Sequence, residues 1–236
     1  MKRMVMISDI HGCIQQLDRL LQLIAFHPKE DQLILLGDYV DRGPNSKETV
    51  NKVIELVREQ GAIALRGNHD QRLVDLIRND SHAIRSKFLQ HGGAQTIQSY
   101  CDLDLDHDVT DEILDQAIET IRVRYSHHID FLSDLPLYHE DENHIYVHAG
   151  LNPAFANWKE QSEHDFMYIK DPFIRSDFDL GKTVVFGHTR AMAIHGSADV
   201  WFGRDKIGID GGCAYGMQLN GLIYQDEIYK TVRIEL

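Results

Sequence analysis

The sequence has 236 residues, 43% of them hydrophobic, which is enough to bury a sizeable core in one domain or in one domain with an insertion. The formal net charge of −13 argues against a non-specific nucleic-acid binder and against a protein held on membranes by a basic surface. Cys13, Cys101 and Cys213 follow no zinc-binding spacing and favour a reducing, cytoplasmic location, and no segment predicts a signal peptide or a membrane-spanning helix.

The first third of the chain alternates between short apolar runs and apolar residues at helical spacing. The predicted elements are strands over 3–8, 33–36 and 62–65, a helix from Ile14 that ends near His27-Pro28, and a helix from about Ser46 that stops around Gly61. We expect a polar turn after each strand, including one at Arg66 to Asp70. Alternation of this kind is typical of a largely parallel sheet with right-handed crossovers, so the sequence predicts an α/β fold.

The pattern then changes. Residues 71–135 are more polar and helical, which predicts a helical insertion or a helical side layer. Strands return at 143–148 and 182–187, each with a histidine at its end. Short apolar runs between Val200 and Ile234 predict a β-meander.

Five predicted strands end in side chains that can bind a metal. These residues are Asp9 and His11, Asp38, Asn68, His148, and His188. Each alone has an ordinary explanation, because an aspartate can cap a helix and an asparagine can fill a turn. Ligands bind at the carboxyl ends of strands in open α/β sheets, so their joint occurrence predicts one metal site.

The donor types narrow the choice of metal. Oxygen and imidazole donors without thiolate suit manganese, iron or zinc, and we favour manganese. Six ligands exceed the need of one catalytic ion, whereas two ions about 3.5 to 4 Å apart that share a carboxylate fit the number. With only Asp9 and Asp38 as carboxylates, the two ions would keep a net positive charge that attracts phosphate.

These residues also carry a family resemblance. In order, the chain contains Ser8-Asp9-Ile10-His11-Gly12, Gly37-Asp38-Tyr39-Val40-Asp41-Arg42-Gly43, Gly67-Asn68-His69-Asp70, His148-Ala149-Gly150 and Gly187-His188-Thr189. This series resembles the calcineurin-like metallophosphoesterases and, within them, the PPP-type serine/threonine phosphatases of bacteria and phages. The resemblance implies a four-layer α/β/β/α sandwich, here one domain over 1–236 with a helical insertion at about 71–135.

The resemblance also implies roles for individual residues. Asp9 and His11 would bind the first metal ion, Asn68, His148 and His188 the second, and Asp38 would bridge both. A metal-bridging hydroxide would attack phosphorus directly. His69 would be the general acid, Asp41 would orient it, and Arg42, together with Asn68, would bind the phosphoryl group.

One part of the family pattern is missing. Relatives commonly place a second phosphate-binding arginine between the last two histidine motifs. The corresponding stretch here is Tyr168-Ile169-Lys170-Asp171, followed by Arg175. A lysine is a point charge and not a bidentate fork. Lys170 and Arg175 are therefore both candidates for the second clamp.

The resemblance predicts a metal-dependent phosphatase that acts on phosphoserine and phosphothreonine, with phosphotyrosine as a further substrate. The alternative is a dinucleoside polyphosphate hydrolase, because diadenosine tetraphosphatases share all five motifs. In symmetrical tetraphosphatases the residue matching Asp41 is typically alanine, whereas asymmetrical ones can keep the aspartate. A non-catalytic scaffold is the third hypothesis, and the intact set of ligands argues against it. The expected partner is a phosphorylated protein or a small phosphoester, without nucleic acid or membrane.

Overall fold

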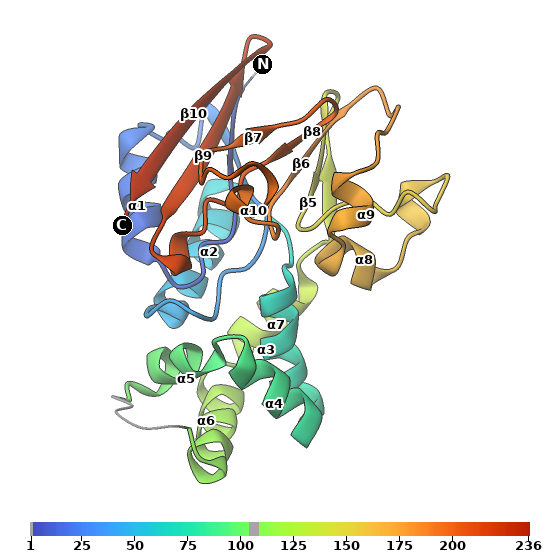
Figure 1. The fold of residues 1–236 in the computed structure, drawn as a ribbon. Coiled ribbons are helices and arrows are strands. Elements are labelled where there is room, and N and C mark those ends of the chain that lie inside the picture. Colours follow the sequence, from blue (N-terminus) through green and yellow to red (C-terminus); the bar gives the residue numbers. More distant parts are fainter. Residues whose placement is uncertain (1, 104–108) are drawn as a thin grey trace.

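Two five-stranded sheets form the centre of the protein (Figure 1). The computed structural model describes residues 2–103 and 109–236. The first sheet has the order β10-β9-β1-β2-β3, with β1 (Arg3–Ile7), β2 (Asp31–Leu35), β3 (Ile63–Ala64), β9 (Gln218–Gln225) and β10 (Ile228–Glu235). The second has the order β4-β5-β6-β8-β7, with β4 (Tyr138–Glu140), β5 (His144–Val147), β6 (Thr183–Phe186), β7 (Trp201–Phe202) and β8 (Lys206–Gly208).

Helices cover the outer faces of both sheets. α1 (Ile14–Leu23) and α2 (Ser46–Gln60) lie beside the first sheet, and α8 (Glu163–Tyr168) and α9 (Asp171–Ile174) lie beside the second (Figure 1). The chain also contains α10 (Ala191–His195) and 3₁₀ turns at Trp158–Glu160 and Cys213–Tyr215. Among the described residues, no helix has the length and apolar character needed to cross a membrane.

The side chains of each strand alternate between two apolar layers, as the two-residue period of a strand requires. In β2, Leu33 packs with α1 and α2, whereas Ile34 packs between the sheets. In β6, Val185 packs between the sheets and Val184 packs toward α8 and α9. The order of layers is helix, sheet, sheet, helix, which confirms the predicted α/β/β/α sandwich.

The insertion begins earlier than predicted. It comprises α3 (Asn68–Asn79), α4 (His82–Gln90), α5 (Gly93–Cys101), α6 (Asp111–Arg124) and α7 (Ser126–Asp134), which extend below the sheets in Figure 1. The predicted turn at Arg66 to Asp70 is therefore wrong, because Asn68, His69 and Asp70 form the first turn of α3. The Asp70 carboxylate accepts a hydrogen bond from the backbone N–H of Gly67 at 2.8 Å, which stabilises this helix start.

The C-terminal tract is not one meander. β7 pairs antiparallel with β8 in the second sheet, whereas β9 and β10 form a hairpin in the first, where β9 pairs antiparallel with β1. The second sheet is therefore parallel in the middle and antiparallel at both margins, whereas the first is parallel from β1 to β3 and antiparallel at β9 and β10, so neither is largely parallel as predicted. β4, which pairs antiparallel with β5, was not predicted. Apolar alternation identifies hairpins but does not identify the sheet that each one joins.

The layer between the sheets should dominate stability. Ile34 is 0% exposed in this layer, so Ile34→Ala should lower the free energy of unfolding by about 2 to 5 kcal/mol. The matched control is Ile228→Ala in β10, where the residue is 59% exposed and the change should stay within about 0.5 kcal/mol. Urea unfolding of both variants measures the difference, and equal changes would contradict the assigned layer.

Candidate metal centre

The six predicted metal ligands lie at one edge of the two sheets. Asp9 and His11 follow β1, Asp38 follows β2, Asn68 starts α3, and His148 and His188 follow β5 and β6. The two sheets thus contribute facing strand ends, as expected for a site at carboxyl ends. All six are buried except His188, which is half-buried.

The backbone at these strand ends is strained. Left-handed backbone angles occur at Asp9 (φ 53°), His11 (φ 47°), Asp38 (φ 60°), Asp41 (φ 71°), Arg42 (φ 70°) and His188 (φ 61°). Such conformations cost on the order of 1 to 3 kcal/mol for residues other than glycine, and they concentrate at functional sites. The surrounding structure must therefore hold these loops in place.

Asp70 provides much of this support. Its buried carboxylate accepts hydrogen bonds from the backbone N–H groups of Asp38 and Tyr39, both at 2.9 Å, in addition to the one from Gly67. Burial, together with the nearby charge of Asp38, raises the pKa of Asp70 to about 7. A Cβ atom at Gly67 would lie 2.3 Å from the backbone nitrogen of Asp38, so the loop after β2 and the start of α3 can approach only at glycine.

Asp38 is shared by two groups of potential ligands. His11, Asp38 and His69 form one group and Asp38, His148 and His188 the other, and in each the ligand atoms lie within 4.8 Å of one another. Oδ2 of Asp38 lies 3.5 Å from Nε2 of His11 and 3.4 Å from Nε2 of His148. A carboxylate between two sets of imidazoles is the arrangement that two cations with a common ligand require.

Backbone carbonyl groups orient the rings of His11 and His148. Nδ1 of His11 lies 2.7 Å from the carbonyl oxygen of Val40, and Nδ1 of His148 lies 2.8 Å from that of Leu36. Because Nδ1 of each ring donates its proton there, Nε2 is the nitrogen that faces Asp38 and would offer its lone pair to a cation. Metal-binding histidines commonly have this second hydrogen bond.

The cluster has the properties of a cation site. The side-chain amide of Asn68 lies 3.1 Å from Nε2 of His148, and the buried Nε2 of His188 has no hydrogen-bond partner in the described part of the chain. Burial alone would lower the pKa of His148, but the charges of Asp38 and Asp9 raise it to about 9. Without a cation, a proton thus balances these carboxylates. The donor set fits a divalent metal, which would replace that proton.

Two features differ from the predicted ligand set. Oδ1 of Asp9 lies 4.0 Å from Nε2 of His11, and its Oδ2 accepts a hydrogen bond from the backbone N–H of His188, so Asp9 belongs to neither three-residue group. Nη1 of Arg42 donates to Nε2 of His11 at 2.6 Å. His11 can therefore bind a cation only when Arg42 releases this nitrogen.

His69 and Asp41 form the predicted pair. Nδ1 of His69 lies 2.7 Å from Oδ2 of Asp41, and Nε2 of His69 accepts a hydrogen bond from Nη2 of Arg42 at 2.7 Å. The hydroxyl of Thr96 in α5 donates to Oδ1 of Asp41 at 2.7 Å and holds the carboxylate in place. Thr96 was not predicted, because helical periodicity identifies the core face of α5 but not the contact of one polar residue.

A cavity of about 340 Å³ lies over this cluster, and its lining has five cationic side chains and two aspartates, Asp38 and Asp210. Its lining includes Arg42, Arg72, Lys87, Lys170 and Arg190. In residues 2–103 and 109–236, none of the five forms an ion pair with a carboxylate. Arg72, Lys87 and Arg190 were not predicted.

The two candidates for the second clamp are placed differently. Lys170 lines this cavity, whereas Arg175 lines a neighbouring cavity of about 440 Å³. The side chain of Arg175 is 80% exposed and pairs with Asp171 at 3.1 Å. The structure therefore brings Lys170, but not Arg175, to the metal cluster.

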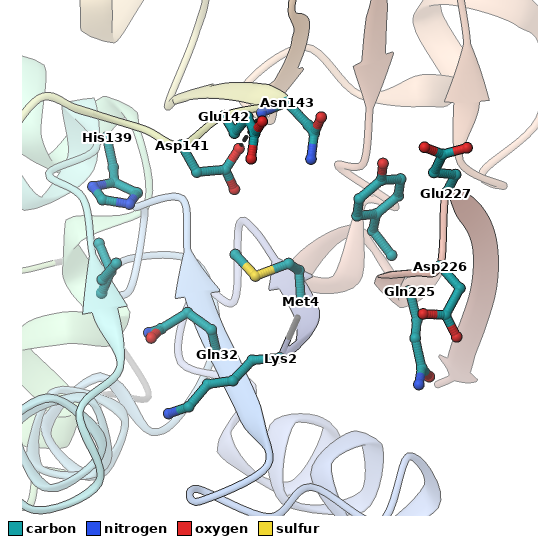
Figure 2. Close-up of a pocket in the computed structure, with 12 residues that line it drawn as sticks. Lys2, Met4, Gln32, His139, Asp141, Glu142, Asn143, Gln225, Asp226 and Glu227 are labelled. Carbon is teal, nitrogen blue, oxygen red and sulfur yellow. Dashed lines mark hydrogen bonds between the residues drawn. The ribbon is translucent and has the colours of Figure 1, made fainter.

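A further cavity, of about 780 Å³, lies elsewhere (Figure 2). It is lined by the first residues of β1, β2 and β3, by the β4–β5 turn and by the β9–β10 turn, which is the opposite end of the parallel strands. Asp141, Glu142, Asp226 and Glu227 contribute carboxylates to its lining, and no predicted site residue does.

Known proteins resemble this chain in sequence and fold. The family model described as calcineurin-like phosphoesterase matches residues 2–192. The asymmetrical bis(5'-nucleosyl)-tetraphosphatase PrpE of Oceanobacillus iheyensis is 26% identical over 96% of this chain and 90% of its own length. Serine/threonine-protein phosphatase 1 of Salmonella typhimurium is 27% identical over 90% of this chain and 88% of its own length. A protein serine/threonine phosphatase structure from Saccharomyces cerevisiae shares the fold, with a TM-score of 0.62 and 13% identity over 100% of this chain and 80% of that chain.

Asp38 should be required for both metal ions. Asp38→Asn removes the charge between the two imidazole groups, so elemental analysis of manganese-loaded protein should fall from two ions per chain toward none. The control is Asp130→Asn, because the Asp130 side chain is 66% exposed in α7 and should leave the metal content unchanged. Two tightly bound ions in Asp38→Asn would contradict the shared carboxylate.

Proposed function

The chain belongs to the calcineurin-like phosphoesterase family, and from this premise we propose that it cleaves dinucleoside tetraphosphates asymmetrically. It is a metallophosphoesterase, and phosphoester hydrolysis is its reaction class. A tetraphosphate chain has three bridging oxygens. Cleavage at either outer bridge gives a nucleoside triphosphate and a nucleoside monophosphate, whereas cleavage at the central bridge gives two diphosphates.

The observation that carries this proposal is the charge of the cavity over the metal centre. Five cationic side chains line it, and none is neutralised by a carboxylate within the described ranges. A phosphomonoester needs few cations beyond the metal ions, but a tetraphosphate spreads its negative charge over four phosphates. The full-length similarity to an asymmetrical tetraphosphatase supports the same assignment.

In this proposal the metal ligands are Asp9, His11, Asp38, Asn68, His148 and His188, and the ions are manganese. Bound divalent ions would activate water and neutralise phosphate charge. Oxygen and imidazole donors without thiolate are compatible with manganese. The unpaired thiols of the three cysteines are compatible with a cytoplasmic location, which is also part of the proposal.

The other residues supply binding and proton transfer. Arg42 would release His11 and bind the phosphoryl oxygens through its two Nη groups. The attacking water loses a proton as its oxygen bonds to phosphorus, the bond from phosphorus to the leaving oxygen breaks, and Nε2 of His69, once protonated and released by the two arginines, would give the leaving oxygen its proton. Asp41 holds Nδ1 of the same ring and would stabilise its protonated form.

Phosphoprotein hydrolysis is the second candidate. The Salmonella relative is named as a protein phosphatase, and the His69–Asp41 pair suits the protonation of a serine or threonine alkoxide, which is a poor leaving group. Alanine is typical at the position of Asp41 in symmetrical tetraphosphatases. Asp41 is thus compatible with both the asymmetrical tetraphosphatase and the protein phosphatase.

A direct rate comparison tests the proposal. Manganese-loaded protein should hydrolyse diadenosine tetraphosphate with a kcat/KM at least about tenfold above that for phosphoserine and phosphothreonine peptides, because about 1.4 kcal/mol of extra phosphate binding gives this factor. Chromatography should show ATP and AMP as products. Chelator-treated protein is the control. Two ADP molecules as products would contradict the asymmetrical reaction, and faster turnover of the peptides would favour the phosphatase.

The role of His69 depends on the leaving group. His69→Asn should slow the hydrolysis of alkyl phosphate esters by at least about 10²-fold, because a poor leaving group needs the proton. The rate of phosphoanhydride hydrolysis should fall by a smaller factor, since the leaving phosphate is more stable as an anion. Metal content serves as the control and should stay at the wild-type value. If rates fell equally for all leaving groups, His69 would not be the general acid.

A further inference from the structure

Arg72 is a buried guanidinium without a counter-charge. It is 8% exposed in α3, and its Nε has no hydrogen-bond partner in the described residues. No carboxylate in the same ranges forms an ion pair with it. Burying an unpaired positive charge is costly, so such an arginine indicates an anion that binds from the adjoining cavity.

The position of Arg72 specifies where that anion would lie. Arg72 follows His69 by three positions, so the two side chains share one face of α3. Nη1 of Arg72 lies 3.0 Å from Nε2 of His69, the atom that also accepts from Arg42 at 2.7 Å. Two guanidinium groups thus converge on the nitrogen that would protonate the leaving oxygen.

Both arginines border the metal cluster, but only Arg72 continues beyond His69. Arg42 contacts His11, and Nη2 and Nη1 of Arg72 lie 3.0 and 3.1 Å from the side-chain amide of Asn68. The guanidinium of Arg72 also lies 5.5 Å from the ring centre of Tyr168, and Lys87 lies 5.4 Å from the same ring. A cation–π contact positions a cation but leaves its charge available to an anion. Arg72 and Lys87 therefore extend the positive charge beyond His69.

We propose that Arg72 binds the phosphate group adjacent to the scissile bond on its leaving side and so makes the site select phosphoanhydrides over simple phosphomonoesters. This inference rests on the proposed function, because it assigns the leaving side from the role of His69. The leaving group of a tetraphosphate begins with a phosphate that Arg72 can bind. In a serine or threonine ester the leaving oxygen is attached to carbon, which offers Arg72 no charge.

The test compares Arg72→Gln with wild type on diadenosine tetraphosphate and on p-nitrophenyl phosphate. Loss of a charged, bidentate contact should lower kcat/KM for the tetraphosphate by about 10- to 100-fold, and by a clearly smaller factor for the monoester. Arg72→Lys should recover part of the difference, because it keeps the charge but not the fork. Arg78→Gln on the same helix is the matched control, since Arg78 pairs with Asp130 away from the cavity.

Binding provides a readout independent of turnover. Calorimetry of the manganese-loaded protein should show that wild type prefers pyrophosphate to orthophosphate and that Arg72→Gln loses this preference. Metal content and melting temperature establish that each variant is folded, and Arg72→Lys replaces Arg72→Gln in both assays if the latter fails to fold. Equal losses on both substrates, or an unchanged preference for pyrophosphate, would overturn the role of Arg72.

The proposed function can fail separately. If wild type hydrolyses p-nitrophenyl phosphate but not diadenosine tetraphosphate, the tetraphosphatase proposal is wrong. The pyrophosphate preference then decides the role of Arg72 alone. Its loss in Arg72→Gln would keep Arg72 as a binding residue for the second phosphate, and its persistence would remove that role.

Discussion

The site depends on how the Asp38 carboxylate is held. Its Oδ1 accepts a hydrogen bond from the backbone N–H of His69 at 2.9 Å, and its own N–H is bound by Asp70. These bonds join the loop after β2 to the start of α3 and leave Oδ2 to face the imidazoles of His11 and His148. The left-handed backbone at Asp38 is strained, and this network is the compensation that the strain requires. The geometry of both ligand groups therefore depends on the fixed position of Oδ2 of Asp38.

Around this oxygen, a strongly acidic protein maintains a cationic cavity. The net charge of −13 opposes the approach of anions at long range, although salt screens that effect beyond about 8 Å at physiological ionic strength. Arg42 and Arg190 lie 5.0 and 4.1 Å from the ring centre of Tyr215, as Arg72 and Lys87 do from Tyr168 at similar distances. Placing cations over aromatic rings holds them without cancelling their charge. Phosphate recognition must therefore come from short-range contacts inside the cavity.

The sequence predicted the parts of this arrangement that follow from strand ends. A run such as 33–36 followed by Gly37-Asp38 identifies a buried strand and a polar residue at its carboxyl end, so the residues that cluster at this edge could be named as candidate metal ligands without coordinates. Thr96 and Lys87 could not be predicted as site residues, because they come from helices whose position over the site is set by tertiary packing. The position of Arg72, in contrast, could have been predicted from its spacing in the sequence. Had the segment from Asn68 been assigned to a helix and not to a turn, its position three residues after His69 would have placed it on the same face. The C-terminal hairpins join different sheets, and that choice depends on which strand edges remain unpaired after the parallel strands form.

The helical insertion links these observations. α5 provides the Thr96 hydroxyl that fixes Asp41, α3 carries His69 and Arg72, and α4 provides Lys87. The predicted metal ligands other than Asn68 come from the sheet loops, which also provide Arg42, whereas His69, Arg72 and Lys87 come from the insertion. A change in α3 or α4 can alter the charge beside the leaving group while the carboxylate and imidazole cluster stays intact. The sheet loops and the insertion meet at the first turn of α3, where Asn68 faces the metal cluster and His69 faces the cavity. We infer that this turn couples the chemistry common to the family with the substrate preference of this chain.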